Sequence, residues 1–180
     1  MGRPLPYGSL IFNIFEYMKR IILISLIGMM AVISAGAQSN LKKIYDEEAD
    51  QMEQIDKAVR KAGKEGRFVI CQVGGNWCRW CLMFADFISK DEEISGLVND
   101  NFCYIHVNYN PRKPKDETTL KMLERLKNPE RFGFPVLVVL DGKGNVIHTQ
   151  DSSLLEEGNG YNRDKVIRFF SNWTPEAVNR

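Results

Sequence analysis

The residues best suited to carry out a reaction are two cysteines in the run Trp77-Cys78-Arg79-Trp80-Cys81. Their spacing puts the two sulfur atoms about one helical turn apart, close enough to form a disulfide. The run follows an apolar stretch and opens a predicted helix, whose free N–H groups and positive dipole end favour a thiolate over a thiol. A thiolate is the nucleophile in thiol–disulfide exchange. Because Cys78 lies nearest the helix start, we predict that Cys78 attacks a substrate disulfide and that Cys81 resolves the mixed disulfide.

Other uses of this cysteine spacing find less support. A zinc site needs further ligands, but there is no second C-x-x-C, and His106 and His148 fall in predicted strands far from the pair. A c-type haem needs a histidine directly after Cys81, where Leu82 stands. An inert bridge gains little from closing so small a ring. The sequence therefore predicts a redox pair with no cofactor and no metal ligand; metal handling by the same thiols is the weaker alternative.

The elements that position the pair follow from hydrophobic periodicity. The mostly apolar run 68–73 predicts a buried strand, glycines at 74 and 75 end it, and residues 77–89 predict the helix that carries the cysteines. Further helices are predicted at 46–64, 91–99, 118–127 and 163–173, further strands at 102–108, 136–140 and 146–149, and a polar loop at 150–160. Strands separated by helices are expected to pair in parallel, with an antiparallel hairpin last. The prediction is an α/β fold, a small mixed β-sheet with helices on both faces.

With these elements in place, the chain resembles the thioredoxin superfamily. The resemblance rests on Trp77 and the C-x-x-C after a buried strand, on Gly133-Phe134-Pro135 before another strand, and on the Asp-Gly-Lys-Gly turn at 141–144. It covers residues 46–173 and is nearest to exported thioredoxin-like proteins related to the C-terminal domain of the bacterial transmembrane thiol:disulfide interchange protein. It implies a thioredoxin fold and thiol–disulfide oxidoreductase activity on proteins.

The resemblance also implies roles for residues around the pair. Pro135 matches the family's cis-proline, which lies beside the cysteines, although a proline that merely starts a strand is the simpler alternative. The backbone of Phe134 would then pair with the substrate chain like an added strand. Trp77 would form an apolar lip around the sulfurs, or else serve as a core aromatic residue.

Three positions depart from the thioredoxin pattern. Gln72 stands where thioredoxins carry a buried aspartate that helps to move protons, so water or another carboxylate must do this, or the reaction is slower. Arg79 and Trp80 replace the Gly-Pro of thioredoxin. A cation beside Cys78 favours its thiolate and makes the pair more oxidising, unless the side chain points into solvent. Trp80 would enlarge the apolar surface around the site.

The N-terminal residues predict export. Met18-Lys19-Arg20 precedes an apolar run at 21–35 and the small residues Ala35-Gly36-Ala37, the order found in a secretory signal peptide. The run is shorter than the roughly 20 residues of a spanning helix, which disfavours the alternative of a membrane anchor. We expect a signal peptide at 1–37, with Met18 as an alternative start, then a tether at 38–45 and the thioredoxin-like domain at 46–180.

Composition and charge exclude some classes of binding partner. Removal of residues 1–37 takes away three bases and one acid and changes the net charge from +1 to −1, which gives no electrostatic case for nucleic acid. Export, most simply to a bacterial periplasm, suits a disulfide centre. The other two cysteines, Cys71 and Cys103, are expected in core strands, a second disulfide being the alternative.

Two functions remain open from the sequence. The first is an exported enzyme that exchanges disulfides with protein substrates and is recycled by a membrane redox partner, with no membrane anchor of its own after cleavage. The second is a thioredoxin-fold scaffold that binds a partner without turnover.

Overall fold

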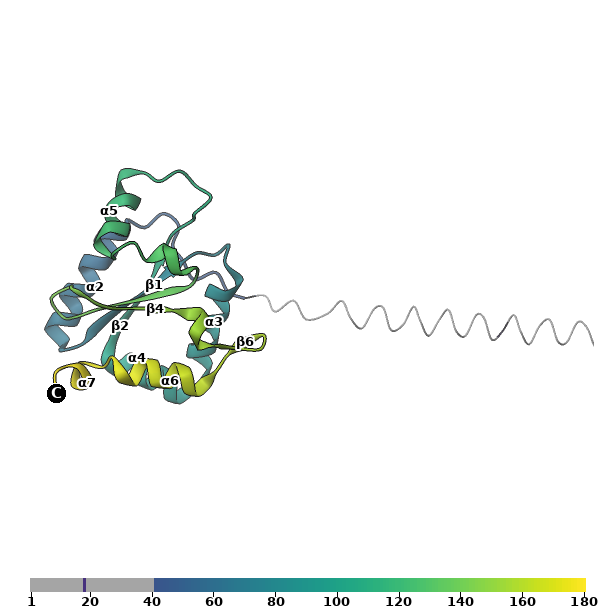
Figure 1. Cartoon of the computed structure of the whole chain (residues 1–180). Coiled ribbons are helices and arrows are strands. Elements are labelled where there is room, and N and C mark those ends of the chain that lie inside the picture. Colours follow the sequence, from purple (N-terminus) through teal and green to yellow (C-terminus); the bar gives the residue numbers. More distant parts are fainter. Residues whose placement is uncertain (1–17, 19–40) are drawn as a thin grey trace, which may run out of the picture. The chain divides into compact units, whose positions relative to one another are not determined.

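The computed structural model describes Met18 and residues 41–180, and the second stretch forms one unit from Leu41 to Arg180 (Figure 1). Apart from Met18, the predicted signal peptide and the predicted tether up to residue 40 lie outside the described residues. No helix in the described part of the chain is long and apolar enough to cross a membrane.

A four-stranded sheet lies at the centre of this unit, in the order β2-β1-β3-β4. Its strands are β1 (Phe68–Gly74), β2 (Phe102–Asn108), β3 (Val136–Leu140) and β4 (Val146–Asp151). All residues of the two central strands, β1 and β3, are buried, as expected for apolar strands that helices cover on both faces. β1 pairs in parallel with β2, whereas β3 and β4 form an antiparallel hairpin. The predicted mixed sheet is confirmed.

Helices cover both faces of the sheet (Figure 1). One face packs against α2 (Gln51–Glu65) and α5 (Glu117–Arg125), and the other against α3 (Arg79–Lys90), α4 (Glu92–Asn101) and α6 (Arg163–Asn172). Side chains of β1 alternate between the two faces, as the pleat requires. Val69, Cys71 and Val73 join the core under α2 and α5, while Phe68 and Ile70 join the core under α3, α4 and α6. The same alternation directs Gln72 toward α3.

The direction predicted for β3 is wrong. A strand separated from the others by a helix was expected to pair in parallel, but β3 runs antiparallel to β1. The connection from β2 to β3 leaves and returns at the same end of the sheet. There the N–H of Tyr109 donates to the carbonyl oxygen of Gly74 over 2.6 Å, and Val136 at the start of β3 pairs with Val73. α5 accounts for only part of this connection, and the chain after it, with the 3-10 helix η1 (Pro129–Phe132), brings it back.

Two helices begin later than periodicity indicates, because a polar cap sets each start. α2 begins at Gln51 and not at Asp46, since the carboxylate of Asp50 accepts the N–H of Glu53. α3 begins at Arg79, because Cys78 is extended and acts as its N-cap. Cys78 therefore lies just before the first turn of α3 and not inside it.

The C-terminal third contains short helices and strands that its polar sequence does not predict. β4 extends to Asp151, beyond its predicted end. The predicted loop at 150–160 contains a 3-10 helix, η2 (Ser152–Leu155), and most of a short hairpin, β5 (Glu156–Glu157) and β6 (Gly160–Tyr161). A last short helix, α7, spans Pro175–Val178. Two-residue strands are too short for an alternating pattern, so periodicity does not reveal them.

Candidate active site

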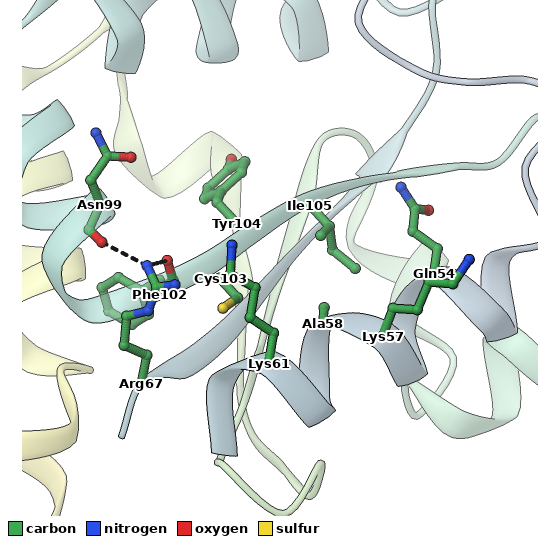
Figure 2. Close-up of a pocket in the computed structure, with 10 residues that line it drawn as sticks. All are labelled: Gln54, Lys57, Ala58, Lys61, Arg67, Asn99, Phe102, Cys103, Tyr104 and Ile105. Carbon is green, nitrogen blue, oxygen red and sulfur yellow. Dashed lines mark hydrogen bonds between the residues drawn. The ribbon is translucent and has the colours of Figure 1, made fainter. Parts of the chain in front are cut away.

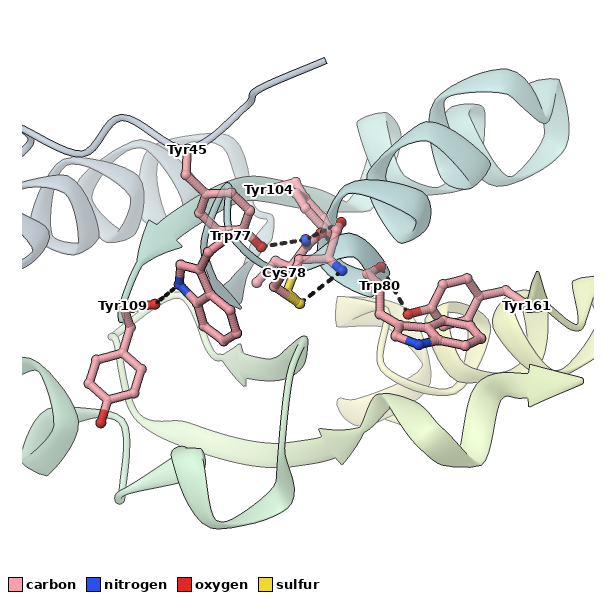
Figure 3. The surroundings of a disulfide bond; sticks show 9 residues. Tyr45, Trp77, Cys78, Trp80, Tyr104, Tyr109 and Tyr161 are labelled. Atoms are coloured by element: carbon pink, nitrogen blue, oxygen red, sulfur yellow. Dashed lines mark hydrogen bonds between the residues drawn. A yellow bond between two sulfur atoms is a disulfide. The ribbon is translucent and has the colours of Figure 1, made fainter. Parts of the chain in front are cut away.

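Cys78 and Cys81 are joined by a disulfide where β1 leads into α3 (Figure 3). Their Cα atoms lie 5.3 Å apart. The sulfur of Cys78 accepts the N–H of Cys81 at 3.1 Å, so this sulfur receives a free donor of the helix start. The two cysteines differ in access: Cys78 is 7% exposed, whereas Cys81 is fully buried. An incoming thiol or disulfide therefore reaches Cys78 first.

Gly74 allows the disulfide to lie directly against β1. A Cβ atom at Gly74 would come within 2.5 Å of the Cys81 sulfur, closer than such atoms approach in proteins. At the next position the carbonyl oxygen of Gly75 accepts the N–H of Cys78 at 3.0 Å and turns the chain toward the helix. Gly74, which the sequence suggests as a strand end, thus also makes room for the sulfur pair, and Gly75 makes room for the Trp77 indole.

Trp77 and Phe134 form one wall beside the disulfide. The indole N–H of Trp77 donates to the carbonyl oxygen of Tyr109 at 2.9 Å, and its ring meets that of Phe134 edge-on at 5.4 Å between centroids. Trp77 remains 38% exposed, so it is a surface aromatic residue and not a core one. Phe134 is half-buried and packs against the buried cluster of the two cysteines. The Phe134–Pro135 peptide bond is cis.

The opposite side of the pair is formed by Trp80 and Tyr161. The hydroxyl of Tyr161 donates to the carbonyl oxygen of Trp80 at 3.1 Å, and the two rings meet edge-on at 5.5 Å (Figure 3). Trp80 is half-buried and packs against the cysteine cluster, whereas Arg79 is exposed. Tyr161 belongs to β6, 81 residues from Trp80. Tyr161 directly follows the predicted polar loop at 150–160, and no sequence pattern there indicated this contact.

Gln72 is fully buried beneath the disulfide and makes three hydrogen bonds. Its side-chain nitrogen donates to the hydroxyl of Tyr45 at 2.6 Å and to the carbonyl oxygen of Cys81 at 2.9 Å. Its side-chain oxygen accepts the hydroxyl of Tyr104 at 2.6 Å. None of these three hydrogen-bond partners of Gln72, all within residues 41–180, is a carboxylate. Among the described residues, Gln72 therefore does not bond to the other carboxylate that the sequence left open as a substitute. Burial raises the pKa of Tyr45 and of Tyr104 well above the ordinary value, so both stay neutral.

Tyr45 corrects the predicted extent of the tether. It is only 4% exposed and packs with the cysteine pair. The side-chain oxygen of Asn76 accepts the N–H groups of Ile44 and Tyr45 at 3.0 and 3.1 Å, and its nitrogen donates to the Tyr45 carbonyl oxygen at 2.8 Å. Residues 44 and 45 thus belong to the folded unit. A single tyrosine before a helix carries no pattern that could have indicated this.

The remaining cysteines, Cys71 and Cys103, are buried free thiols in the core under α2 and α5, so the alternative of a second disulfide is wrong. Burial raises the pKa of Cys71 to about 12, which leaves its thiol protonated and unreactive. Among the described residues, no three or more His, Cys, Asp or Glu side chains are grouped to hold a metal ion.

A separate cavity of about 430 Å³ lies between α2 and the edge strand β2 (Figure 2). Basic side chains at its rim include Lys57, Lys61 and Arg67, and Cys103 contributes to its lining. Neither cysteine of the disulfide lines it. It is therefore distinct from the site around Cys78.

The helix-flanked mixed sheet, with a cysteine pair where its central strand meets a helix, defines the thioredoxin fold. A disulphide isomerase from Xylella fastidiosa Temecula1 shares this fold with a TM-score of 0.62 and 22% identity, over 73% of this chain and 97% of that one. The chain belongs to the family described as Thioredox_DsbH, protein of unknown function, DUF255, whose model matches residues 33–167.

Curated relatives resemble a shorter part of the chain. Spermatogenesis-associated protein 20 of Rattus norvegicus and that of Mus musculus are each 31% identical over 67 residues. The match covers 37% of this chain and 8% of each relative, so the chain corresponds to a small part of those proteins.

Proposed function

We propose that this protein is a thiol–disulfide oxidoreductase that exchanges disulfides with protein substrates through Cys78 and Cys81. The observation that carries the proposal is the asymmetry of the pair. The more accessible sulfur sits at a helix N-cap, where a thiolate is stabilised, and its partner is buried directly behind it. One sulfur is thus suited to meet a substrate and the other to release it.

In the reducing direction, the Cys78 thiolate attacks one sulfur of a substrate disulfide. The substrate S–S bond breaks, its other sulfur departs as a thiolate, and Cys78 becomes joined to the substrate. Cys81, as a thiolate, then attacks the Cys78 sulfur, the substrate leaves as its second thiolate, and the Cys78–Cys81 bond forms. Two electrons pass from the protein to the substrate. The reverse sequence donates a disulfide.

The aromatic side chains around the pair supply a surface for a polypeptide substrate. Trp77 and Phe134 stand on one side of the accessible sulfur and Trp80 on the other. Such rings offer large apolar contact without requiring one particular sequence. We assign pairing with the substrate chain to the backbone of Phe134, which packs against the cluster of the two cysteines.

Mixed-disulfide capture tests this function. Cys81→Ser leaves the attacking thiol but removes the resolving one, so covalent complexes between Cys78 and its substrates should accumulate. We expect several different partners, which non-reducing electrophoresis and mass spectrometry would identify. Cys78→Ser, with the buried thiol alone, is the matched control and should capture few. Recovery of a single stoichiometric partner would instead indicate a binding protein that does not turn over.

Export is the second part of the proposal. The basic start, the apolar run at 21–35 and the small residues before residue 38 support cleavage of a signal peptide and release into a bacterial periplasm. Disulfide exchange there would require a membrane-bound redox partner to recycle the pair. N-terminal sequencing of the protein from fractionated bacterial cells provides the test. A mature chain that begins at Gln38 in the periplasmic fraction supports export, whereas an intact N-terminus in the cytosolic fraction contradicts it.

A further inference from the structure

We infer that the hydroxyl of Tyr45 donates a hydrogen bond to the Cys81 sulfur when the pair is reduced, and so stabilises the thiolate that resolves the mixed disulfide. This inference deepens the proposed function and rests on it. It assigns to a neutral hydroxyl part of the task that a buried carboxylate has in thioredoxins. Three observations carry it: the orientation of the Gln72 amide, the common position of two atoms over Gly74, and the burial of Cys81.

The Gln72 amide has only one orientation that satisfies its neighbours. The main-chain carbonyl oxygen of Cys81 can only accept, so the side-chain nitrogen of Gln72 must face it. The same nitrogen donates to the hydroxyl oxygen of Tyr45. The amide oxygen faces Tyr104, whose hydroxyl must therefore donate. It follows that Tyr45 accepts from Gln72 and that its own proton points elsewhere.

The Cys81 sulfur is the acceptor to which we assign that proton. A Cβ atom built on Gly74 would lie 3.0 Å from the Tyr45 hydroxyl oxygen and 2.5 Å from the Cys81 sulfur, so both atoms sit over the same point of β1. Tyr45 and the two cysteines also form one buried cluster. Figure 3 shows the tyrosine ring reaching the pair from the side of the N-terminal segment. The absence of a side chain at Gly74 leaves the space between them open.

Burial makes a donor necessary at this sulfur. Cys81 is fully buried, and desolvation of a thiolate disfavours its formation unless a hydrogen bond compensates. Tyr45 can supply that bond but cannot remove the proton, because burial keeps its own pKa high. The proton of Cys81 therefore passes to the substrate thiolate that departs in the first step. That group is the base generated beside Cys78, so the step needs no carboxylate.

The other titratable groups near Tyr45 do not take over this role. His106 of β2 lies with its ring centroid 5.4 Å from that of Tyr45, and burial lowers its pKa to about 4, so it is neutral near pH 7. The hydroxyl of Tyr104 donates to Gln72, and that of Tyr161 donates to the carbonyl oxygen of Trp80. Glu47 accepts a hydrogen bond from Asn76 at the surface, and Arg79 on α3 is exposed.

The test compares two tyrosine-to-phenylalanine variants in the chain that starts at Gln38. Both remove a hydroxyl bonded to Gln72, but only Tyr45→Phe removes the one beside Cys81. After reaction of the reduced protein with oxidised glutathione, we expect Tyr45→Phe to slow resolution of the Cys78–glutathione disulfide roughly tenfold, the loss of one hydrogen bond to a charged group. Tyr104→Phe should slow it about threefold or less. A wild-type rate in Tyr45→Phe, or equal slowing by both variants, would overturn the inference.

A second measurement keeps the inference separate from the proposed function. In a Cys78→Ser background, the ultraviolet absorbance of the Cys81 thiolate can be titrated without any turnover. Adding Tyr45→Phe should lower the fraction of Cys81 present as thiolate about tenfold at a pH below the midpoint of its titration. An unchanged titration contradicts the hydrogen bond even if the protein exchanges disulfides. A lower thiolate fraction in the variant supports it even if no protein substrate is captured. Urea unfolding of each variant shows whether the fold is retained.

Discussion

At the scale of single residues, the site depends on how two sulfur atoms three positions apart come to have different surroundings. Cys78 caps α3 and is slightly exposed, while Cys81 is fully buried and lies against β1 over Gly74. The sequence already predicts this division of roles from the helix start. The buried surroundings of Cys81, however, include Gln72, which donates to its carbonyl oxygen, and Tyr45, and only the structure brings these residues together.

Arg79 provides a residue-scale prediction about the direction of exchange. It occupies the first position of α3, is exposed, and directly follows Cys78. Its positive charge favours the Cys78 thiolate, hence the reduced state, and so raises the reduction potential. We expect Arg79→Gln, which keeps a good helix former, to lower the potential in glutathione buffers by about 10–20 mV.

The salt dependence supplies the control for Arg79. Because an exposed charge is screened, the difference between wild type and Arg79→Gln should shrink in about 1 M salt. An equal or higher potential in the variant would show that Arg79 does not tune the pair. The absolute potential also informs on direction: about −270 mV matches a thioredoxin-like reductant, and about −120 mV a disulfide donor.

At the scale of elements, β2 contributes more than its sequence indicates. Alternation places Phe102, Tyr104 and His106 on the same face, and His106 pairs with Gln72 in the register of β1 and β2. The Nε2 atom of His106 is buried without a hydrogen-bond partner. Predicted only as a strand residue far from the cysteines in sequence, His106 in fact lies between Tyr45 and Tyr104.

The buried imidazole predicts acid sensitivity of the fold. Burial lowers the pKa of His106 from 6.5 to about 4, so the unfolded chain binds this proton at a higher pH than the folded one. Stability should fall as the pH drops from about 6.5 toward 4, by at most about 3 kcal/mol. His106→Phe, which keeps an aromatic ring between the tyrosines, should lose less over that window. Urea unfolding at pH 7 and pH 4.5 compares the two proteins, and identical losses would exclude His106 as the cause.

At the scale of the whole molecule, the N-terminal segment completes the site from 32 residues away. Asn76 in the loop before Cys78 holds the main chain of Ile44 and Tyr45, and the Tyr45 ring covers the inner side of the disulfide. The folded unit therefore begins ahead of α2. Tyr161, from the C-terminal part of the chain, also contributes to the site, because its hydroxyl donates to the carbonyl oxygen of Trp80.

A truncation tests this boundary. A chain that begins at Asp46, the start expected from helical periodicity, lacks Tyr45 and leaves Gln72 short of one partner. We expect it to be about 3 kcal/mol less stable than the chain that begins at Gln38, the cost of removing a large buried aromatic side chain. Urea unfolding of the two oxidised proteins measures the difference. Equal free energies of unfolding would mean that residues 38–45 act only as a tether.

The sequence by itself determined the class of fold, the cysteine pair and the strand-to-helix junction that carries it, because each is encoded in a short run of residues. Hydrophobic spacing marks β1, glycines end it, and the C-x-x-C follows at a fixed distance. Even there, the caps Asp50 and Cys78 moved the helix starts by a few residues.

Tertiary structure alone decided the direction of β3, the hydrogen-bond partners of Gln72 and the inclusion of residues 44 and 45 in the folded unit. Each depends on partners far apart in the chain: β3 on where its connection returns, Gln72 on Tyr45 and Tyr104, and Asn76 on the main chain of residue 45. Local periodicity reports which face of an element is buried. It does not report which distant hydroxyl or carbonyl completes a buried hydrogen bond, because that choice is made only when the elements pack.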